Sequence, residues 1–141
     1  MKRSISIFLM SMCVFQLHAQ TDAQTHKDIE TVCNYYLDGG TNGDSIMFSK
    51  AFRPEGQMLF MRNDTMQIVS LKDFMARIHN THQKVNRTAK IESIQVFGDA
   101  AVAILSIETE TASIHDIMSL LKTKEGWKIV GKIFSREMKM K

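Results

Sequence analysis

Residues 97–134 read FGDAAVAILSIETETASIHDIMSLLKTKEGWKIVGKIF. They contain three runs rich in β-branched and other apolar residues, a composition typical of strands. Turn-forming residues lie at positions 98–99, 110–113 and 124–126. This pattern predicts an antiparallel meander. At about ten residues per strand and about 3.3 Å per residue, the sheet would exceed about 30 Å in length and would curl around the elements that pack against it.

A one-sided apolar stripe precedes these strands and predicts an amphipathic helix. We expect this helix to begin after Thr25 and to end at Gly39-Gly40. A second, short helix is expected after Asp44 as its N-cap, and it must end before Pro54. The stripe consists of Ile29, Val32, Cys33, Tyr36 and Leu37, which recur with helical spacing.

A hairpin and a third helix are expected next. Residues 57–62 and 66–70 have the composition of short strands, and Asn63-Asp64-Thr65 between them is typical of a hairpin turn. Ser70 and Asp73 have the spacing of a capping box, which predicts a helix from Leu71 to about Asn80.

Residues 86–97 predict the first of four long strands, which the meander completes. Because the helices come first, they should gather on one side of the sheet. We therefore expect an α+β fold of cystatin-like, cone-shaped form, in which a strongly bent antiparallel sheet wraps three N-terminal helices.

The first nineteen residues have the features of a secretory signal peptide. Lys2 and Arg3 precede an apolar run from Ile5 to Leu17, which is shorter than the roughly 20 residues that span a bilayer. We expect cleavage after Ala19, export to the periplasm or the medium, and no membrane attachment of the mature chain. Residues 20–141 would then form a single domain.

The net charge bears on binding partners, and the cysteine content bears on disulfide formation. Removal of Lys2 and Arg3 would lower the net charge from +3 to +1, and the remaining chain has no basic cluster. We therefore expect no binding to nucleic acid or to anionic membranes. Cys33 is the one cysteine after residue 19, so no intramolecular disulfide is expected, and a buried thiol is the simplest interpretation.

Both faces of the meander are apolar, which predicts a second covering layer. Ala101, Ala103, Leu105 and Ile107 alternate with Val102 and Ile104. Simple alternation also places Trp127, Ile129 and Ile133 on one face, and Val130 and Phe134 on the other with Lys128 and Lys132. Since three helices can cover one face only, we expect a homodimer through the outer sheet face.

Several short patterns occur together along the chain, at residues 29–37, 43–44, 51–52, 70–74, 98–102 and 126–130. Together they resemble the nuclear transport factor 2-like, or SnoaL-like, superfamily, and more narrowly its bacterial branch described as putative lumazine-binding. The resemblance covers nearly all of residues 20–141. It implies a cone with a pocket between sheet and helices, but the superfamily includes isomerases, dehydratases, cyclases and non-catalytic domains, so it does not select a function.

The resemblance implies catalytic positions that can be compared with this chain. Isomerase-like members have a tyrosine on the first helix, here Tyr36 or Tyr35. Their general base falls near Phe60, which cannot accept a proton. Their second acid falls near Asp116, where a register slip of one residue would exchange it for His115. An enzyme would therefore depend on Asp116 or His115 together with Tyr36.

The implied pocket would be apolar and lined by Tyr36, Phe60, Phe74, Met118 and Trp127. His79 and His82 have no third ligand at a suitable spacing, so no metal site is expected. No motif typical of a pterin or flavin site is present, and we expect no cofactor.

Two functions remain open. The first is an exported module that binds an apolar or aromatic small molecule, or that serves in assembly. The alternative is an enzyme of the cyclase, dehydratase or isomerase type that uses Asp116 or His115 with Tyr36. In that case two of these three groups should approach one another inside the cone.

Overall fold

The computed structural model describes the backbone of residues 5–140 and the side chains of residues 22–140. Residues 1–4, and the side chains of the rest of the expected signal peptide, therefore lie outside what is described, and cleavage after Ala19 stays a prediction. Among the described residues, no helix is both long enough and apolar enough to cross a bilayer.

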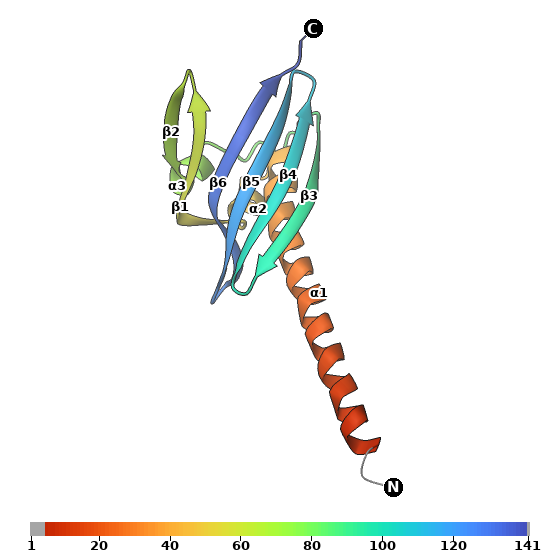
Figure 1. Ribbon diagram of the computed structural model, residues 1–141. Helices are drawn as coiled ribbons and strands as arrows, with labels where there is room; N and C mark the ends of the chain where they lie inside the picture. The colour runs from red at the N-terminus through yellow and green to blue at the C-terminus, as the bar shows by residue number, and fades with distance from the viewer. Residues whose placement is uncertain (1–4, 141) are drawn as a thin grey trace.

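Three helices and six strands make up the described chain (Figure 1). The four long strands follow the helices, so the predicted α+β architecture is confirmed. The elements are α1 (Ile5–Asn42), α2 (Ser45–Ser49), β1 (Phe52–Arg62), β2 (Thr65–Ser70), α3 (Leu71–Ala76), β3 (Arg87–Phe97), β4 (Ala100–Thr109), β5 (Ala112–Thr123) and β6 (Gly126–Met138).

The strands form one curved sheet in the order β2-β1-β6-β5-β4-β3. The predicted meander β3-β4-β5-β6 is antiparallel throughout, as is the β1–β2 hairpin. The sheet differs from expectation in one respect, because β1 pairs with β6 in parallel and the sheet is therefore mixed. A parallel pair needs a long connection between its strands, and here all the chain between β1 and β6 supplies it.

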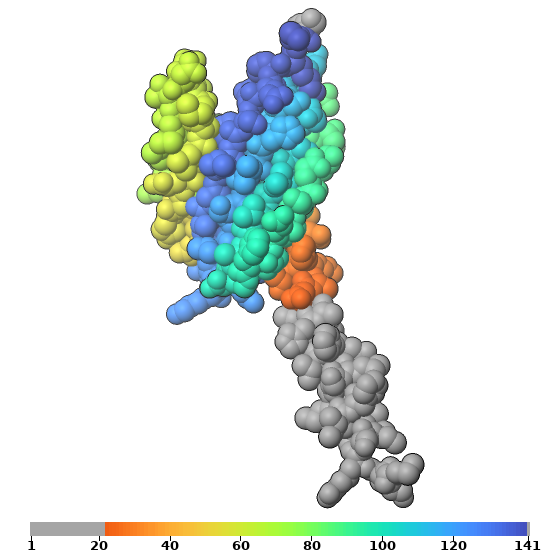
Figure 2. All heavy atoms as spheres, in the orientation of Figure 1, coloured from red at the N-terminus to blue at the C-terminus, as the bar shows by residue number. Residues whose placement is uncertain are grey.

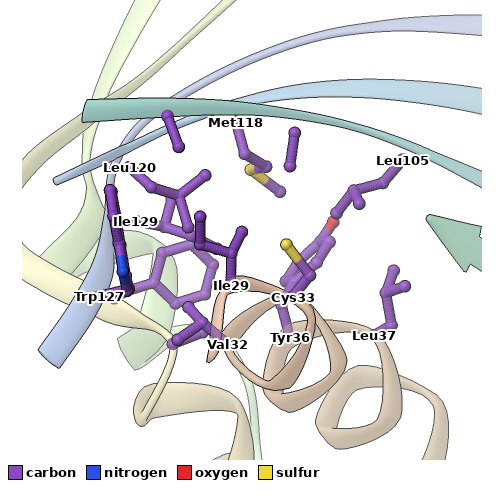
Figure 3. Packing of buried hydrophobic residues seen from close by; sticks show 14 of the residues in the cluster. Ile29, Val32, Cys33, Tyr36, Leu37, Leu105, Met118, Leu120, Trp127 and Ile129 are labelled. Carbon is purple, nitrogen blue, oxygen red and sulfur yellow. The ribbon is translucent and has the colours of Figure 1, made fainter. Parts of the chain in front are cut away.

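The core lies between α1 and the concave face of the sheet (Figure 3). Ile29 and Cys33 of α1 are fully buried against Leu105 of β4, Met118 of β5 and Ile129 of β6. Aliphatic side chains of this size each contribute about 1.5–3 kcal/mol on full burial, so the helical stripe and the inner strand positions account for most of the packing.

The first helix is longer than the sequence predicts: it begins at Ile5 and not after Thr25, and it also ends later. It continues through Gly39 to Asn42, and Gly43 (φ 63°) ends it in the left-handed conformation. The Asp44 N–H donates to the Gly39 carbonyl oxygen at 2.8 Å, which is the hydrogen bond of a Schellman motif. Gly39 does not end the helix but allows α1 and α2 to pack closely, because a Cβ there would lie 2.5 Å from the Phe48 backbone nitrogen of α2.

The predicted starts of the second and third helices are confirmed. The Asp44 side chain caps α2 by accepting from the Met47 N–H at 2.8 Å. Ser70 Oγ accepts from the Asp73 N–H at 3.0 Å and begins α3. That helix ends at Ala76 and not near Asn80, because the turn that follows it is tighter: the N–H groups of Arg77 and Ile78 donate to carbonyl oxygens three residues back.

The hairpin between β1 and β2 has the turn that the sequence predicts. Asn63 and Asp64 both have positive φ, at 49° and 58°, and Arg62 pairs with Thr65 across them. This is the type I′ geometry, which Asn and Asp tolerate better than most residues. The turn holds the hairpin together as an arm at one side of the sheet (Figure 1).

The close approach of α1 and α2 gives a first prediction. Gly39→Ala should lower the free energy of unfolding by about 1–3 kcal/mol, because the new methyl group meets backbone that cannot move independently. Chemical denaturation followed by circular dichroism measures this loss.

Gly40→Ala is the matched control. Its Cβ would meet the tip of the flexible Arg87 side chain at 2.4 Å, and alanine is favoured over glycine inside a helix by about 1 kcal/mol. A loss at Gly40 as large as that at Gly39 would contradict the explanation by helix contact.

Candidate functional site

The register of β6 changes at Val130 and brings a lysine into the core. Leu120 of β5 pairs with Ile129, and Ser119 pairs with Gly131, so Val130 is the extra residue of a β-bulge. After the bulge Lys132 faces the concave side and is 4 % exposed, whereas Ile133 is 48 % exposed. The prediction that Ile133 shares a face with Ile129, and that Lys132 lies on the opposite face, is therefore wrong. Gly131 was the available signal, because an isolated glycine inside a strand often marks a bulge.

The register of β5 decides between His115 and Asp116. Asp116 is fully buried and pairs with Phe134, whereas His115 is exposed on the opposite face. Tyr36 of α1 is also buried and points from the helix towards the sheet (Figure 3). Of the three predicted catalytic candidates, the fold thus brings Tyr36 and Asp116 together and places His115 apart from them.

Tyr36, Asp116 and Lys132 form one buried polar cluster. The Tyr36 hydroxyl donates to Asp116 Oδ2 at 2.6 Å. The Lys132 ammonium donates to Asp116 Oδ1 as an ion pair and lies 3.3 Å from the Tyr36 hydroxyl oxygen. It also lies 5.2 Å from the ring centroid of Tyr36 and 4.8 Å from that of Phe134. The three side chains come from α1, β5 and β6 and bond one another.

Burial dominates the electrostatics of this cluster. It raises the pKa of Tyr36 well above its usual value, and the neighbouring Asp116 carboxylate raises it further. Burial lowers the pKa of Lys132, while the ion pair with Asp116 opposes this effect. Removing one partner of a buried ion pair typically costs about 3–5 kcal/mol, so the cluster is also a structural element.

Arg87 contributes a second cation nearby. It donates from Nη2 to the Leu37 carbonyl oxygen and from Nε to Thr41 Oγ1, both at 2.9 Å. These bonds hold the C-terminal end of α1, where a cation is favoured by the helix dipole. Burial lowers the pKa of Arg87, and the charge of Asp116 is among the effects that oppose the shift.

The cluster does not present a free base. Both carboxylate oxygens of Asp116 accept hydrogen bonds, one from Tyr36 and the other from Lys132. A general base needs an oxygen that can reach the proton of a substrate. The geometry therefore suits a fixed internal network better than proton transfer.

The structure places the five predicted pocket residues in different surroundings. Tyr36, Met118 and Trp127 are buried among packed core side chains (Figure 3). Phe74 packs against Phe48 and Phe52 with ring centroids 5.4 Å and 5.8 Å away. Phe60 differs from the other four, because it lies where the sheet opens.

An apolar groove opens between β1 and β6. Their pairing ends at Leu59 and Ile133, and beyond this point the hairpin and β6 separate, which leaves the notch visible in Figure 2. The groove has a volume of about 450 Å³. Phe60 and Phe134 stack there with ring centroids 4.9 Å apart. The lining residues are Leu59, Phe60, Met61, Met66, His115, Ile117, Ile133, Phe134 and Ser135.

Cys33, His79 and His82 have no activating neighbours among the described residues. Burial raises the pKa of Cys33 to about 12, so its thiol stays protonated and inert. Among the described residues no group of histidine, cysteine and carboxylate side chains could hold a metal ion, and His79 and His82 belong to an exposed segment.

The raised pKa of Tyr36 predicts a loss of stability in alkali. The folded state keeps the phenol protonated, so its contribution is complete below the ordinary pKa of 10.0 and is lost as the pH rises above that value. Tyr36 should ionise only as the protein unfolds. Tyrosinate absorbance and circular dichroism, recorded together along a pH titration, measure both events.

Tyr36→Phe is the matched variant for this experiment. It should remove the part of the absorbance change that coincides with unfolding and leave the signal of Tyr35, the other tyrosine of the chain. If the Tyr36 signal appeared while the fold was intact, the hydroxyl would be accessible and the description of the cluster would be wrong.

Comparison with known proteins agrees with this architecture. An NTF2-like protein of unknown function from Shewanella baltica is 24% identical, with a TM-score of 0.73 over 82% of this chain and 95% of that one. A second, from Silicibacter pomeroyi, is 17% identical, with a TM-score of 0.72 over 82% and 98%. A ketosteroid isomerase-like protein from Erwinia carotovora atroseptica is 17% identical, with a TM-score of 0.59 over 77% and 92%.

At these identities the solved structures establish the fold alone. No curated protein matches the chain. A family model described as putative lumazine-binding matches residues 24–135, which include every element from α2 to β5 and most of β6. The predicted resemblance to this family is thereby confirmed, and the chain belongs to the putative lumazine-binding family.

Proposed function

We propose that this protein is a small-molecule-binding module whose site is the groove between β1 and β6. The observation that carries the proposal is the stacked pair of Phe60 and Phe134 at the point where the sheet opens. The groove volume falls in the range of about 300–1,000 Å³ that is typical of ligand sites. Met61 and Met66 add flexible thioethers, which adapt to flat apolar ligands.

The alternative, an enzyme that uses Asp116 with Tyr36, receives less support. These two groups meet, as that hypothesis requires, but they bond each other and Lys132 rather than a bound molecule. His115 borders the groove without a buried partner for acid-base work. A binding function uses the geometry as it stands.

The groove gives a direct test with N-phenyl-1-naphthylamine, a neutral flat probe that fluoresces in apolar surroundings. We expect saturable binding by the native protein. Phe60→Leu should weaken it by about tenfold, because an aromatic contact is worth about 0.5–1.5 kcal/mol beyond its buried area.

Leu121→Gln is the control for this test, because Leu121 is also exposed but lines a different, charged hollow beside Arg53 and Glu125. Binding to this control should equal that of the native protein. Absence of saturable binding, or equal losses in both variants, would exclude the groove as the site.

We further propose that the mature chain is exported and forms a dimer through the outer face of the sheet. A row of aliphatic side chains crosses that face over five adjacent strands and stays largely open to solvent. Strand register places them side by side in the order Ile68, Leu59, Ile133, Ile117 and Ile104. Four of the five are 38–57 % exposed.

The arrangement of this row favours a second copy of the chain as its partner. Ile133 is the central member, so a two-fold axis through it would set Ile68 of one chain over Ile104 of the other. Such a self-complementary surface is what an isologous interface requires. The row borders the groove at Leu59, Ile117 and Ile133, so the second copy would also form an outer wall for the ligand site.

Native mass spectrometry of protein expressed from the full sequence tests dimer and export together. We expect twice the mass of a chain that begins at Gln20. Ile104→Glu should give monomers without touching the groove lining. Ile46→Glu, at a 66 % exposed position on α2, is the matched control and should remain dimeric.

The two proposals fail separately in this experiment. A chain that retains its first nineteen residues would contradict the export proposal. A native monomer, or a dimer that survives Ile104→Glu, would contradict the proposed interface.

A further inference from the structure

We propose that His115 and Ser135 form a hydrogen-bonding subsite at one side of the groove, and that they select flat aromatic ligands that carry a neutral hydroxyl group. The inference rests on the proposed function, because it assigns a ligand class to the same groove. Three features of the described residues support it: the composition of the groove lining, the register of β5 and β6, and the hydrogen bonds on the outer face of the sheet.

His115 and Ser135, the polar pair, are the two polar residues in the lining of the groove. The other lining residues have aliphatic, aromatic or thioether side chains. The polar pair lies directly opposite across β5 and β6, and both side chains are exposed. Side chains at such positions have Cβ atoms about 4.5–5.5 Å apart. One substituent of a ligand can therefore contact both members of the pair.

The polar pair has unused hydrogen-bonding groups, unlike the serines beside it. Ser106, which lies opposite His115 on β4, donates from Oγ to Glu92 Oε1 at 2.7 Å. Ser113 donates from Oγ to Glu108 Oε2, also at 2.7 Å. Among the described residues, no side-chain hydrogen bond or ion pair engages either member of the polar pair. Their donors and acceptors are therefore available to a ligand.

The carboxylates beside the polar pair are neutralised by lysines. Lys90 forms an ion pair with Glu92 at 3.1 Å, and Lys139 forms one with Glu108 at 2.9 Å. Each pair has no net charge, and solvent screens the field that remains around these exposed groups. A charged ligand thus gains little from this side of the groove, and hydrogen bonding is left to discriminate between ligands.

A hydroxyl group is the substituent that matches the polar pair. A serine hydroxyl both donates and accepts, and a histidine ring donates from one nitrogen and, when neutral, accepts at the other. A ligand hydroxyl can accept from one member of the pair and donate to the other, whereas a carboxylate only accepts and an ammonium only donates. The stacked rings of Phe60 and Phe134 in the same groove favour a planar aromatic body for the ligand.

The test compares 2-naphthol with 2-methylnaphthalene, which share a ring system and differ in a hydroxyl against a methyl group. Displacement of N-phenyl-1-naphthylamine measures the affinity of each compound. Ser135→Ala should lower the ratio of the naphthol affinity to the methylnaphthalene affinity by about fivefold, because one hydrogen bond to the hydroxyl is lost. His115→Phe keeps a ring but removes both nitrogens, and it should lower the same ratio by a similar factor.

Ser119→Ala is the matched control. Ser119 is exposed on the same face of β5, two residues beyond Ile117, and it lies outside the groove lining. The affinity ratio of this variant should equal that of the native protein. A change in apolar contacts alters both affinities alike, so the ratio isolates the hydrogen bonds. A ratio that either test variant leaves unchanged, or an equal loss in the control, would overturn the inference.

The outcomes also distinguish this inference from the function on which it rests. If the native protein binds both compounds but the ratio does not respond to the test variants, the hydroxyl selectivity is refuted and the groove remains a ligand site. If neither compound displaces the probe, both proposals are refuted. The substitutions replace exposed side chains, so the variants should fold as the native protein does, and circular dichroism verifies this.

Discussion

The ion pair between Asp116 and Lys132 is the interaction on which the rest of the structure depends most. It joins two neighbouring strands, and through Tyr36 it joins both to the first helix. A buried charge without a partner is so costly that helix and sheet are held to the one alignment in which all three groups meet. The bulge at Val130 is part of that requirement, because without it Lys132 would face outwards and the buried Asp116 would lose its ionic partner.

The two faces of the sheet have different roles as a result. The concave face is filled by the helical stripe, by a cluster of aromatic rings and by the polar cluster. The outer face keeps exposed aliphatic side chains, and the sheet opens where the hairpin leaves β6. The apolar side chains that stay open to solvent therefore gather at this opening and on the outer face, where we propose that recognition takes place.

Sequence patterns predicted the elements well and their fine positions less well. The strands, the turn at Asn63 and the caps at Asp44 and Ser70 depend on neighbouring residues, so local patterns identify them. Gly39 was interpreted as a helix end because glycine often ends helices. Its role in the structure is a close contact with Phe48, which local sequence does not reveal. Lys132 was placed on the wrong face because period-two alternation fails at a bulge. Sequence reasoning identified Tyr36 and Asp116 as candidates, but it missed Lys132, which forms an ion pair with the Asp116 carboxylate.

The parallel pairing of β1 with β6 has a consequence for how the chain reaches its folded state. Phe52 pairs with Ile129, so a strand made early in synthesis has its partner in almost the last segment of the sequence. Contacts between such distant segments slow folding, because a long loop must close before they yield any stabilisation. Until nearly the whole chain has been made, the β1–β2 hairpin has no strand that joins it to the rest of the sheet, and the core lacks Lys132. A polypeptide that folds so late remains available to be threaded through a translocation channel in an extended form.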